Sequence, residues 1–184
     1  MLKFFAVILL VILVQPVLLS QNMIHQDSYN LDGGILFSAS NSDHPDYNSK
    51  TISIIFNPSF AYHLLDVFSL GGNISYKYSE ETIIHANENF KAITRVFEFG
   101  PKVRYYFHTE NFAPFVNLSF NYSVVLPAKT KGYGFAIGTG INYFFTKSAA
   151  LEPQVSYVIS KYSNPDYNSR TFQLGIGLTY HISD

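Results

Sequence analysis

The sequence contains no cysteine, which excludes a disulfide framework, a thiolate metal site and a lipid-anchored N-terminal cysteine. It also lacks an excess of one charge: the formal net charge is −1 and the two signs are mixed, which gives no indication of nucleic-acid binding. No apolar run reaches the roughly 20 residues that a membrane-spanning helix requires. Aromatic residues are abundant, with 14 Tyr and 17 Phe. A soluble β-sandwich and a membrane β-barrel both fit this composition, because a barrel hides its apolar face in alternation.

The first 20 residues have the pattern of a secretory signal peptide. Lys3 precedes an apolar run of 11 residues, 4–14, which is too short for a spanning helix. We therefore predict a signal peptide at residues 1–20 and a barrel domain at residues 21–184. An uncleaved membrane anchor is the alternative, and the length of the run argues against it.

The rest of the chain alternates between apolar and polar residues with period two, as half-buried strands do. Eight amphipathic segments follow one another: 31–40, 51–63, 67–79, 91–107, 113–126, 132–145, 149–161 and 170–182. Each segment is long enough for a tilted membrane strand, which needs about 9–11 residues. Strands of soluble domains are usually about half that length. Eight is also the smallest even strand number of bacterial outer-membrane barrels. We predict an all-β fold, an eight-stranded antiparallel up-and-down transmembrane β-barrel.

Glycine indicates which face of these strands is the inside. Eight of the eleven glycines lie on the polar face: Gly34, Gly71, Gly100, Gly134, Gly138, Gly140, Gly175 and Gly177. A solvated face gains nothing from glycine, whereas the interior of a narrow barrel requires small residues. The polar face is therefore expected to point inward. It also includes Glu98, Lys102, Arg104 and Glu152, which we predict to pair with one another as an interior charge plug.

The connections and the prolines add two expectations. The turns after the second, fourth and sixth segments are short, and the connectors after the first, third and seventh are longer, as in outer-membrane barrels. The connector after the fifth segment, "PAKTK", is short and departs from that rule. Pro58, Pro101 and Pro153 fall within strands, where β-bulges are expected to accommodate them because proline lacks an N–H.

Three stretches of the chain resemble a known family. "FNPSFAYHLLDVFSLGGNISYKYS" (56–79), "FGPKVRYYFHTENFAPFVNLSFNYS" (99–123) and "GINYFFTKSAALEPQVSY" (140–157) are similar to the porin-family outer-membrane β-barrel domain of Bacteroidetes-type bacteria. The resemblance implies a small barrel like those of the OmpA and OmpX type. Such chains commonly end on an aromatic residue that assists assembly. This chain departs from that pattern, since Tyr180 is its last aromatic residue.

An enzymatic function has one candidate set. His181 and Ser183 are expected to point inward at the end that faces the periplasm, and a symmetric fold-back of the last two strands would place Glu152 opposite His181. Some small outer-membrane barrels that hydrolyse lipid use such groups. A hydrogen-bonded polar plug explains the same residues without catalysis. We favour the plug, and we predict neither a cofactor nor a metal site, since the six histidines have no ligand spacing.

One seven-residue stretch occurs twice: "PDYNSKT" at 45–51 and "PDYNSRT" at 165–171. In a closed barrel the first and last hairpins are neighbours, so we expect the two copies to stand side by side on the outer rim. Shared turn chemistry of Pro, Asp and Asn is one explanation. A paired surface site is the other, with Tyr47 and Tyr167 as contacts and Asp46 and Asp166 as cation ligands.

These observations favour a small monomeric outer-membrane protein with a structural or surface-interaction role. The signal peptide would direct it to the bacterial outer membrane. Its expected partners are outer-membrane lipid, lipopolysaccharide and the outer-membrane assembly machinery. A narrow passive porin is the alternative, although eight strands enclose a space that side chains just fill. An outer-membrane lipid hydrolase is less favoured, and we predict that the protein is not an enzyme.

Overall fold

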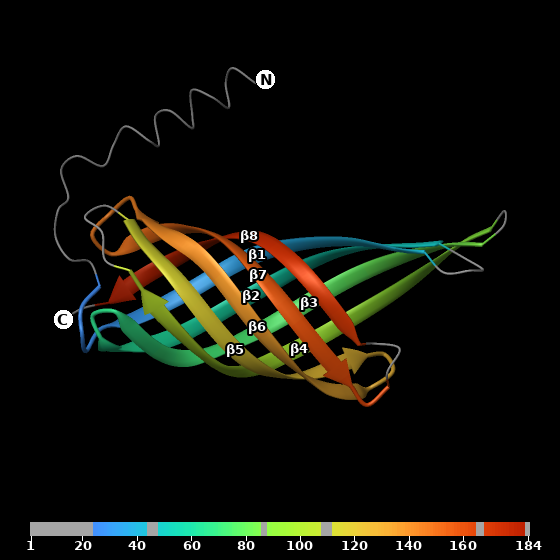
Figure 1. Cartoon of the computed structure of the whole chain (residues 1–184), viewed down its shortest axis with the longest axis horizontal. Coiled ribbons are helices and arrows are strands. Elements are labelled where there is room, and N and C mark those ends of the chain that lie inside the picture. Colours follow the sequence, from blue (N-terminus) through green and yellow to red (C-terminus); the bar gives the residue numbers. More distant parts are fainter. Residues whose placement is uncertain (1–23, 44–47, 86–87, 108–111, 165–167, 183–184) are drawn as a thin grey trace, which may run out of the picture.

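The computed structural model describes residues 24–43, 48–85, 88–107, 112–164 and 168–182. Their strands form one closed antiparallel barrel in chain order (Figure 1). The strands are β1 (Tyr29–Asp43), β2 (Asn48–Leu65), β3 (Phe68–His85), β4 (Glu88–Tyr106), β5 (Phe112–Leu126), β6 (Thr130–Phe144), β7 (Ala149–Tyr162) and β8 (Ser169–Ile182). Pairing of β1 with β8 closes the sheet. The predicted fold class is confirmed. None of the described residues forms a helix long and apolar enough to cross a membrane.

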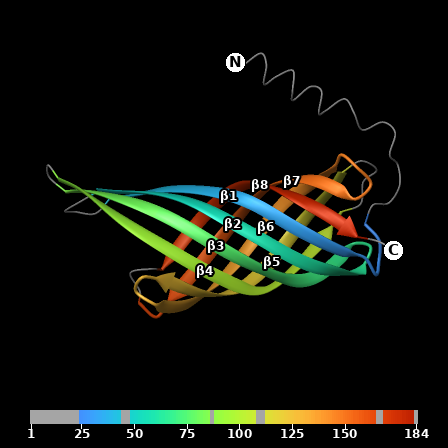
Figure 2. The ribbon, with the colours of Figure 1, turned by 180° about the vertical axis from the view of Figure 1, so that it is seen from behind.

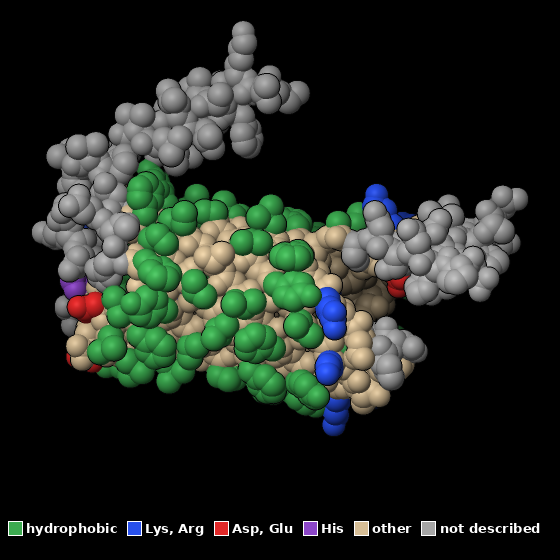
Figure 3. Space-filling model, in the orientation of Figure 1, with side chains coloured by type: hydrophobic (Ala, Val, Ile, Leu, Met, Phe, Trp, Pro, Cys, Tyr) green, Lys and Arg blue, Asp and Glu red, His purple; other side chains and the backbone are tan. Residues whose placement is uncertain are grey.

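The large apolar side chains of the strands point outward. Phe135 is 46% exposed whereas its neighbour Ala136 is 9% exposed, and this alternation recurs along every strand. Figure 3 shows the result on the face in view, where a band of apolar side chains covers most of the outer surface of the barrel. The polar face lies inside, as the glycines indicated. The interior of the barrel therefore holds the groups that could form a site.

Two glycines are required by close approach of neighbouring strands. A Cβ atom at Gly71 would lie 1.9 Å from the backbone oxygen of Phe60, and one at Gly100 would lie 1.9 Å from that of Phe120. Real Cβ atoms do not approach backbone oxygen so closely. Both glycines face the interior, so they let the wall of the barrel curve tightly.

The strand prolines are accommodated without the bulges that the sequence led us to expect. Pairing skips two positions beside each proline and resumes in the same register: Phe56↔Tyr76 is followed by Ser59↔Asn73, Phe99↔Tyr122 by Lys102↔Ser119, and Gly140↔Gln154 by Tyr143↔Leu151. The register shift that the described strands do contain lies elsewhere, between His63 and Leu65. The bulge prediction is therefore wrong. A local gap in the ladder tolerates the missing N–H because the flanking pairs hold the register.

The connector expected after the third segment is also different. Residues 80–90, between the third and fourth segments, were predicted as a connector, but β3 and β4 remain paired to the last described pair, His85↔Glu88. The β1–β2 hairpin likewise continues to Asp43↔Asn48. β5 pairs with β4 only from Arg95 onward, and β8 pairs with β1 only as far as Phe37. The first four strands therefore project beyond the other four, as both views of the ribbon show (Figure 2).

The barrel thus has two unlike ends. At one end lie Ile24, Ile182 and short turns such as that between Leu65 and Phe68, and we call it the short-turn end (Figure 1). At the other lie the projecting hairpins, and we call it the hairpin end. On the projecting part Lys91 donates a hydrogen bond of 2.5 Å to Glu80, which raises the pKa of the Lys91 ammonium.

Candidate functional site

The most highly charged part of the interior is centred on Arg104 of β4 and Glu152 of β7. The guanidinium donates two hydrogen bonds to the carboxylate, from Nη1 to Oε2 at 2.7 Å and from Nη2 to Oε1 at 2.9 Å. Each side chain is 2% exposed. Because β4 and β7 are not neighbours in the sheet, this bidentate pair crosses the interior. Paired hydrogen bonds of this kind fix geometry as well as charge.

A second carboxylate completes the cluster. Asp32 of β1 lies 3.6 Å from Arg104 Nη2 and accepts a hydrogen bond of 3.3 Å from Lys102 Nζ. Ser59 donates to Asp32 at 2.8 Å, and Asn30 donates to the other carboxylate oxygen at the same distance. Two cations and two anions from β1, β4 and β7 therefore neutralise one another. We call Asp32, Lys102, Arg104 and Glu152 the charge quartet.

The quartet differs from the predicted set in one member. Lys102 pairs with Asp32, and it also donates to Ser59 at 3.0 Å. Glu98 instead accepts a hydrogen bond of 3.0 Å from Ser123, and it forms no ion pair with another described residue. Lys102 and Glu98 are four residues apart on one strand, and their side chains bind different partners, Asp32 and Ser123. Glu98, which was predicted to pair within the interior charge plug, therefore lies apart from the quartet.

Apolar side chains close the interior on the short-turn side of the quartet. The centre of the Arg104 guanidinium lies 4.0 Å from the centroid of the Phe115 ring, a cation–π contact. Phe115 and Tyr106 are fully buried, and their rings meet edge to face at 6.1 Å. Ile24, Ala113 and Phe144 pack with them. We call these five residues the apolar floor.

Two histidines lie beside the floor. His63 of β2 and His181 of β8 are both buried, with ring centroids 5.6 Å apart. His63 contacts Tyr106 and His181 contacts Phe144. None of the four ring nitrogens has a hydrogen-bond partner among the described residues. The rings therefore serve mainly as packing groups at this level of the barrel.

The arrangement of residues expected for a catalytic site is not present among the described residues. Glu152 pairs in register with Gly177, four residues before His181, so the predicted opposition of Glu152 and His181 is wrong. The carboxylate oxygens of Glu152 are occupied by Arg104 and by Thr179, which donates at 2.8 Å. Ser183 lies outside the described residues. The structure therefore does not bring a Glu-His-Ser set together.

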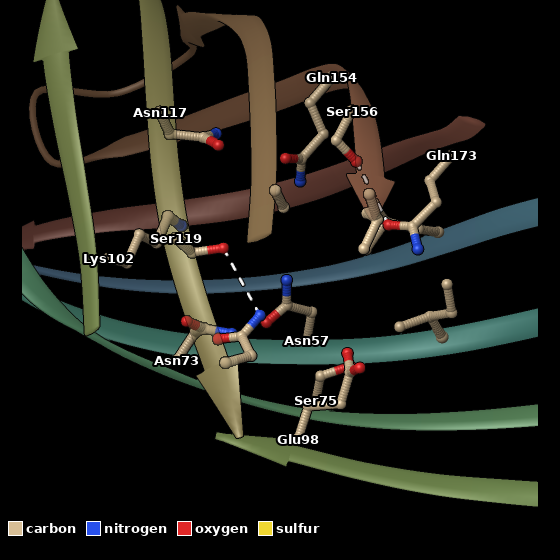
Figure 4. Close-up of a pocket in the computed structure, with 15 residues that line it drawn as sticks. Asn57, Asn73, Ser75, Glu98, Lys102, Asn117, Ser119, Gln154, Ser156 and Gln173 are labelled. Atoms are coloured by element: carbon tan, nitrogen blue, oxygen red, sulfur yellow. Dashed lines mark hydrogen bonds between the residues drawn. The ribbon is translucent and has the colours of Figure 1, made fainter. Parts of the chain in front are cut away.

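The interior toward the hairpin end is polar and less tightly filled. A cavity of about 50 Å³ is lined largely by amides and hydroxyls, including Asn57, Asn73, Ser119, Gln154 and Gln173 (Figure 4). Its polar groups come from all parts of the wall, and Ser156 donates to Gln173 at 3.2 Å across two strands. A polar cavity needs about 10–15 Å³ of this kind of volume to hold a water molecule, so the cavity has room for water. Glu98 and Lys102 lie on its wall.

The predicted surface pair is not visible. Asp46, Tyr47, Asp166 and Tyr167 lie outside the described residues. Pairing of β1 with β8 ends at Phe37↔Leu174, before either copy of the repeat, so strand register does not join the two copies. Within the described ranges, no group of three or more His, Cys, Asp or Glu side chains could hold a metal ion.

Sequence analysis missed Asp32, Tyr106 and Phe115. Asp32 was on the polar face of the first segment, so its inward direction was available from alternation alone. Tyr106 and Phe115 also follow the inward alternation, but a rule that places aromatics toward lipid passes over them. Their signal was the position of two large rings on a face otherwise made of small and polar residues.

No protein-family model and no curated protein matches the sequence. Solved structures do match. The chain superposes on the outer membrane protein OprG of Pseudomonas aeruginosa with a TM-score of 0.67 and 13% identity, over 88% of this chain and 99% of that one. Neisserial surface protein A superposes with a TM-score of 0.54 and 15% identity, over 83% of this chain and 96% of that one. Ail of Yersinia pestis superposes with a TM-score of 0.52 and 10% identity, over 86% of this chain and 99% of that one. The chain therefore has the fold of the small eight-stranded outer-membrane barrels.

Proposed function

We propose that the protein is a small, closed outer-membrane barrel with a structural or surface-interaction role. The apolar band supports a membrane location, because such a surface in water would be a strong aggregation site. Exposed aromatics lie toward both margins of the band, where amphipathic rings favour the membrane interface: Tyr29, Tyr105, Phe107 and Tyr180 at the short-turn end, and Phe97, Phe120, Tyr133 and Phe172 toward the hairpin end. The signal peptide proposed at 1–20 supplies the route.

Orientation follows from the two ends. Bacterial outer-membrane barrels have short turns in the periplasm and longer loops outside. The short-turn end would therefore face the periplasm and the projecting hairpins would face the medium. The three stretches quoted above support a place in the Bacteroidetes-type porin family. A monomer assembled by the outer-membrane machinery, in contact with outer-membrane lipid and lipopolysaccharide, completes the proposal.

The main support for a closed barrel is the ion pair between Arg104 and Glu152. It crosses the interior with two short hydrogen bonds, and the apolar floor lies directly beneath it. A passing solute would have to separate two buried charges, which costs several kcal/mol, about the penalty for removing one partner. Passive conduction is therefore opposed at this level of the barrel.

The projecting hairpins are the part that favours surface interaction. They present exposed apolar side chains beyond the last pair of β4 with β5, among them Phe90 at 54% and Ile93 at 49%. The two outer strands of this four-stranded extension are edges, and an edge offers unpaired N–H and C=O groups to another chain. A contact surface of this kind suits attachment or assembly better than transport.

Planar-bilayer conductance of the refolded protein tests the proposal. The wild type is expected to give no steady channels, because the quartet and the floor close the interior. The double variant Arg104→Ala/Glu152→Ala removes the crossing pair and is expected to give brief openings, whereas Lys129→Ala, at an exposed turn, stays silent. Steady wild-type channels would contradict the proposal and favour the second candidate, a narrow passive porin. The polar cavity toward the hairpin end is the observation that favours that candidate.

A further inference from the structure

Cationic side chains gather on the outside of the barrel at the hairpin end. Lys131 of β6, Lys161 of β7 and Arg170 of β8 are all exposed and follow the outward alternation of their strands. Figure 3 shows Lys and Arg side chains along the margin where the apolar band ends. These residues therefore lie at the boundary of the membrane rather than within its apolar layer.

Strand register places the three cations next to one another. Lys161 pairs with Tyr133, two residues from Lys131, and Arg170 pairs with Ile159, two residues from Lys161. Each cation is thus the diagonal neighbour of the next, at a separation of roughly 7–8 Å between backbones. Lysine and arginine side chains are long enough to reach one ligand from backbones at that separation. We call Lys131, Lys161 and Arg170 the basic arc.

The arc has no countercharge in the part of the chain that the structure describes. None of its three residues forms an ion pair there. Glu152 is the one acidic side chain described between Phe112 and Ile182, and it is buried against Arg104. Like charges on adjacent strands destabilise a sheet. Among the described residues, the three neighbouring cations thus have no carboxylate beside them, and an anionic ligand would neutralise their charge.

Aromatic side chains lie one step from the arc toward the middle of the barrel. Tyr133 stacks with Phe120 at 6.2 Å, and Tyr157 contacts Phe172 at 4.9 Å between ring centroids. Tyr133 is the direct partner of Lys161, and Phe172 is two residues from Arg170. Aromatic belts mark the level of lipid headgroups. The arc is thus placed where headgroup phosphates lie.

We propose that Lys131, Lys161 and Arg170 form a binding surface for the phosphate groups of an outer-leaflet glycolipid, the phosphorylated saccharide of lipopolysaccharide. The inference rests on the outer-membrane location proposed above. Arg170 can donate two parallel hydrogen bonds to one phosphate, and the lysines act as point charges on either side. The acyl chains of the same lipid would lie against Phe120 and Phe172. One ligand thus satisfies both the charge of the arc and the apolar surface beneath it.

The test is native mass spectrometry of detergent-solubilised protein titrated with diphosphorylated lipid A. Three proteins are compared: the wild type, Lys131→Gln/Lys161→Gln/Arg170→Gln, and the matched control Lys50→Gln/Lys91→Gln/Lys147→Gln, which removes three exposed cations elsewhere. Each cation near an anionic surface strengthens binding by about fivefold, so loss of the arc is expected to weaken binding by about a hundredfold at low ionic strength. The control is expected to bind lipid A as tightly as the wild type does. Lipid A without its phosphates is expected to bind the wild type weakly, with an affinity close to that of lipid A for the arc variant.

Four results would overturn the proposal: unchanged binding in the arc variant, an equal loss in the control, tight binding of dephosphorylated lipid A, or displacement of lipid A by inorganic phosphate at millimolar concentration. The last would assign the surface to free phosphate. Folding is checked separately by the gel mobility of unheated and heated samples after refolding into phosphatidylcholine vesicles. A wild type that does not insert contradicts the membrane proposal, whereas an arc variant that inserts and binds lipid A as the wild type does contradicts the basic arc alone.

Discussion

The two halves of the barrel interior are filled in different ways. Toward the short-turn end, Arg104 and Glu152 are both 2% exposed, share two hydrogen bonds and rest on closely packed aromatic rings. Toward the hairpin end, Glu98 accepts a hydrogen bond from Ser123 and borders a cavity lined by amides and hydroxyls. One half is ion-paired and closely packed, and the other has room for water.

This difference shows how a narrow barrel can bury charge. Where aromatic rings close the interior, the four charged side chains form a neutral quartet, because an unpaired buried charge is costly. The ring nitrogens of His63 and His181 beside it have no partner among the described residues. Where the wall leaves space, amides such as Asn73 and Asn121 have oxygens without a protein partner, and water can satisfy them. The charged half determines closure, whereas the polar half tolerates change.

The largest effect is expected from Arg104→Ala. The substitution leaves Glu152 and Asp32 buried with less countercharge, and breaking such a pair costs about 3–5 kcal/mol of unfolding free energy. Because the chain has no tryptophan, unfolding by urea in detergent micelles is followed by far-ultraviolet circular dichroism, which gives the midpoint urea concentration. Lys129→Ala, at an exposed turn, is the control and is expected to leave the midpoint unchanged.

A second variant separates the lost charge from the lost contacts. Arg104→Met/Glu152→Leu replaces both partners with apolar side chains of similar size and is expected to be more stable than Arg104→Ala, because no charge of this pair remains buried. Equal midpoints for Arg104→Ala and Lys129→Ala would remove the distinction between the two halves.

An intermediate effect is expected from glycine substitutions in the two halves. Gly71→Ala forces a Cβ to within 1.9 Å of the Phe60 oxygen, and overpacking of this kind costs about 1–3 kcal/mol. Gly134→Ala, toward the hairpin end, meets nothing nearer than the Ser160 hydroxyl at 3.2 Å, and that side chain can turn away. Thermal unfolding of both variants in one detergent gives the comparison, and a greater loss at Gly134 would contradict it.

The smallest effect is expected from Glu98→Gln. The new amide keeps an oxygen that accepts the hydrogen bond of Ser123, and the cavity beside it can supply water. The unfolding free energy should change by less than about 1 kcal/mol. If the urea midpoint of Glu98→Gln fell as far as that of Arg104→Ala, the hairpin half would have to be as tightly organised as the other.

Alternation along the chain predicted most of the fold. It gave eight strands, the inward direction of Arg104 and Glu152, and the outward direction of residues such as Phe135, because side chains on a strand alternate whatever their neighbours are. It did not predict that β3 and β4 stay paired to His85 and Glu88. Turn-like composition in that stretch hides pairing, since two strands that support each other need little hydrophobic signal.

Partner choice within the site was less predictable. The inner face predicted a set of charges that pair with one another but not which charge meets which, and Lys102 binds Asp32 from β1. The gaps in pairing beside Pro58 and Pro153 also lie outside what local sequence shows. Each depends on the height at which distant strands meet, and that height is set by the stagger of the closed sheet.

By itself, the sequence determined the number of strands, the face on which each side chain lies, and the supply of interior charges, because these follow from covalent alternation and composition. Only the tertiary structure decided that Arg104 meets Glu152 across the interior, that Asp32 joins them, and that Lys131, Lys161 and Arg170 become neighbours outside. The physical reason is the closure of the barrel. A closed, staggered sheet brings together residues from strands far apart in the chain, and the distance between those residues is a property of the sheet and of no single strand.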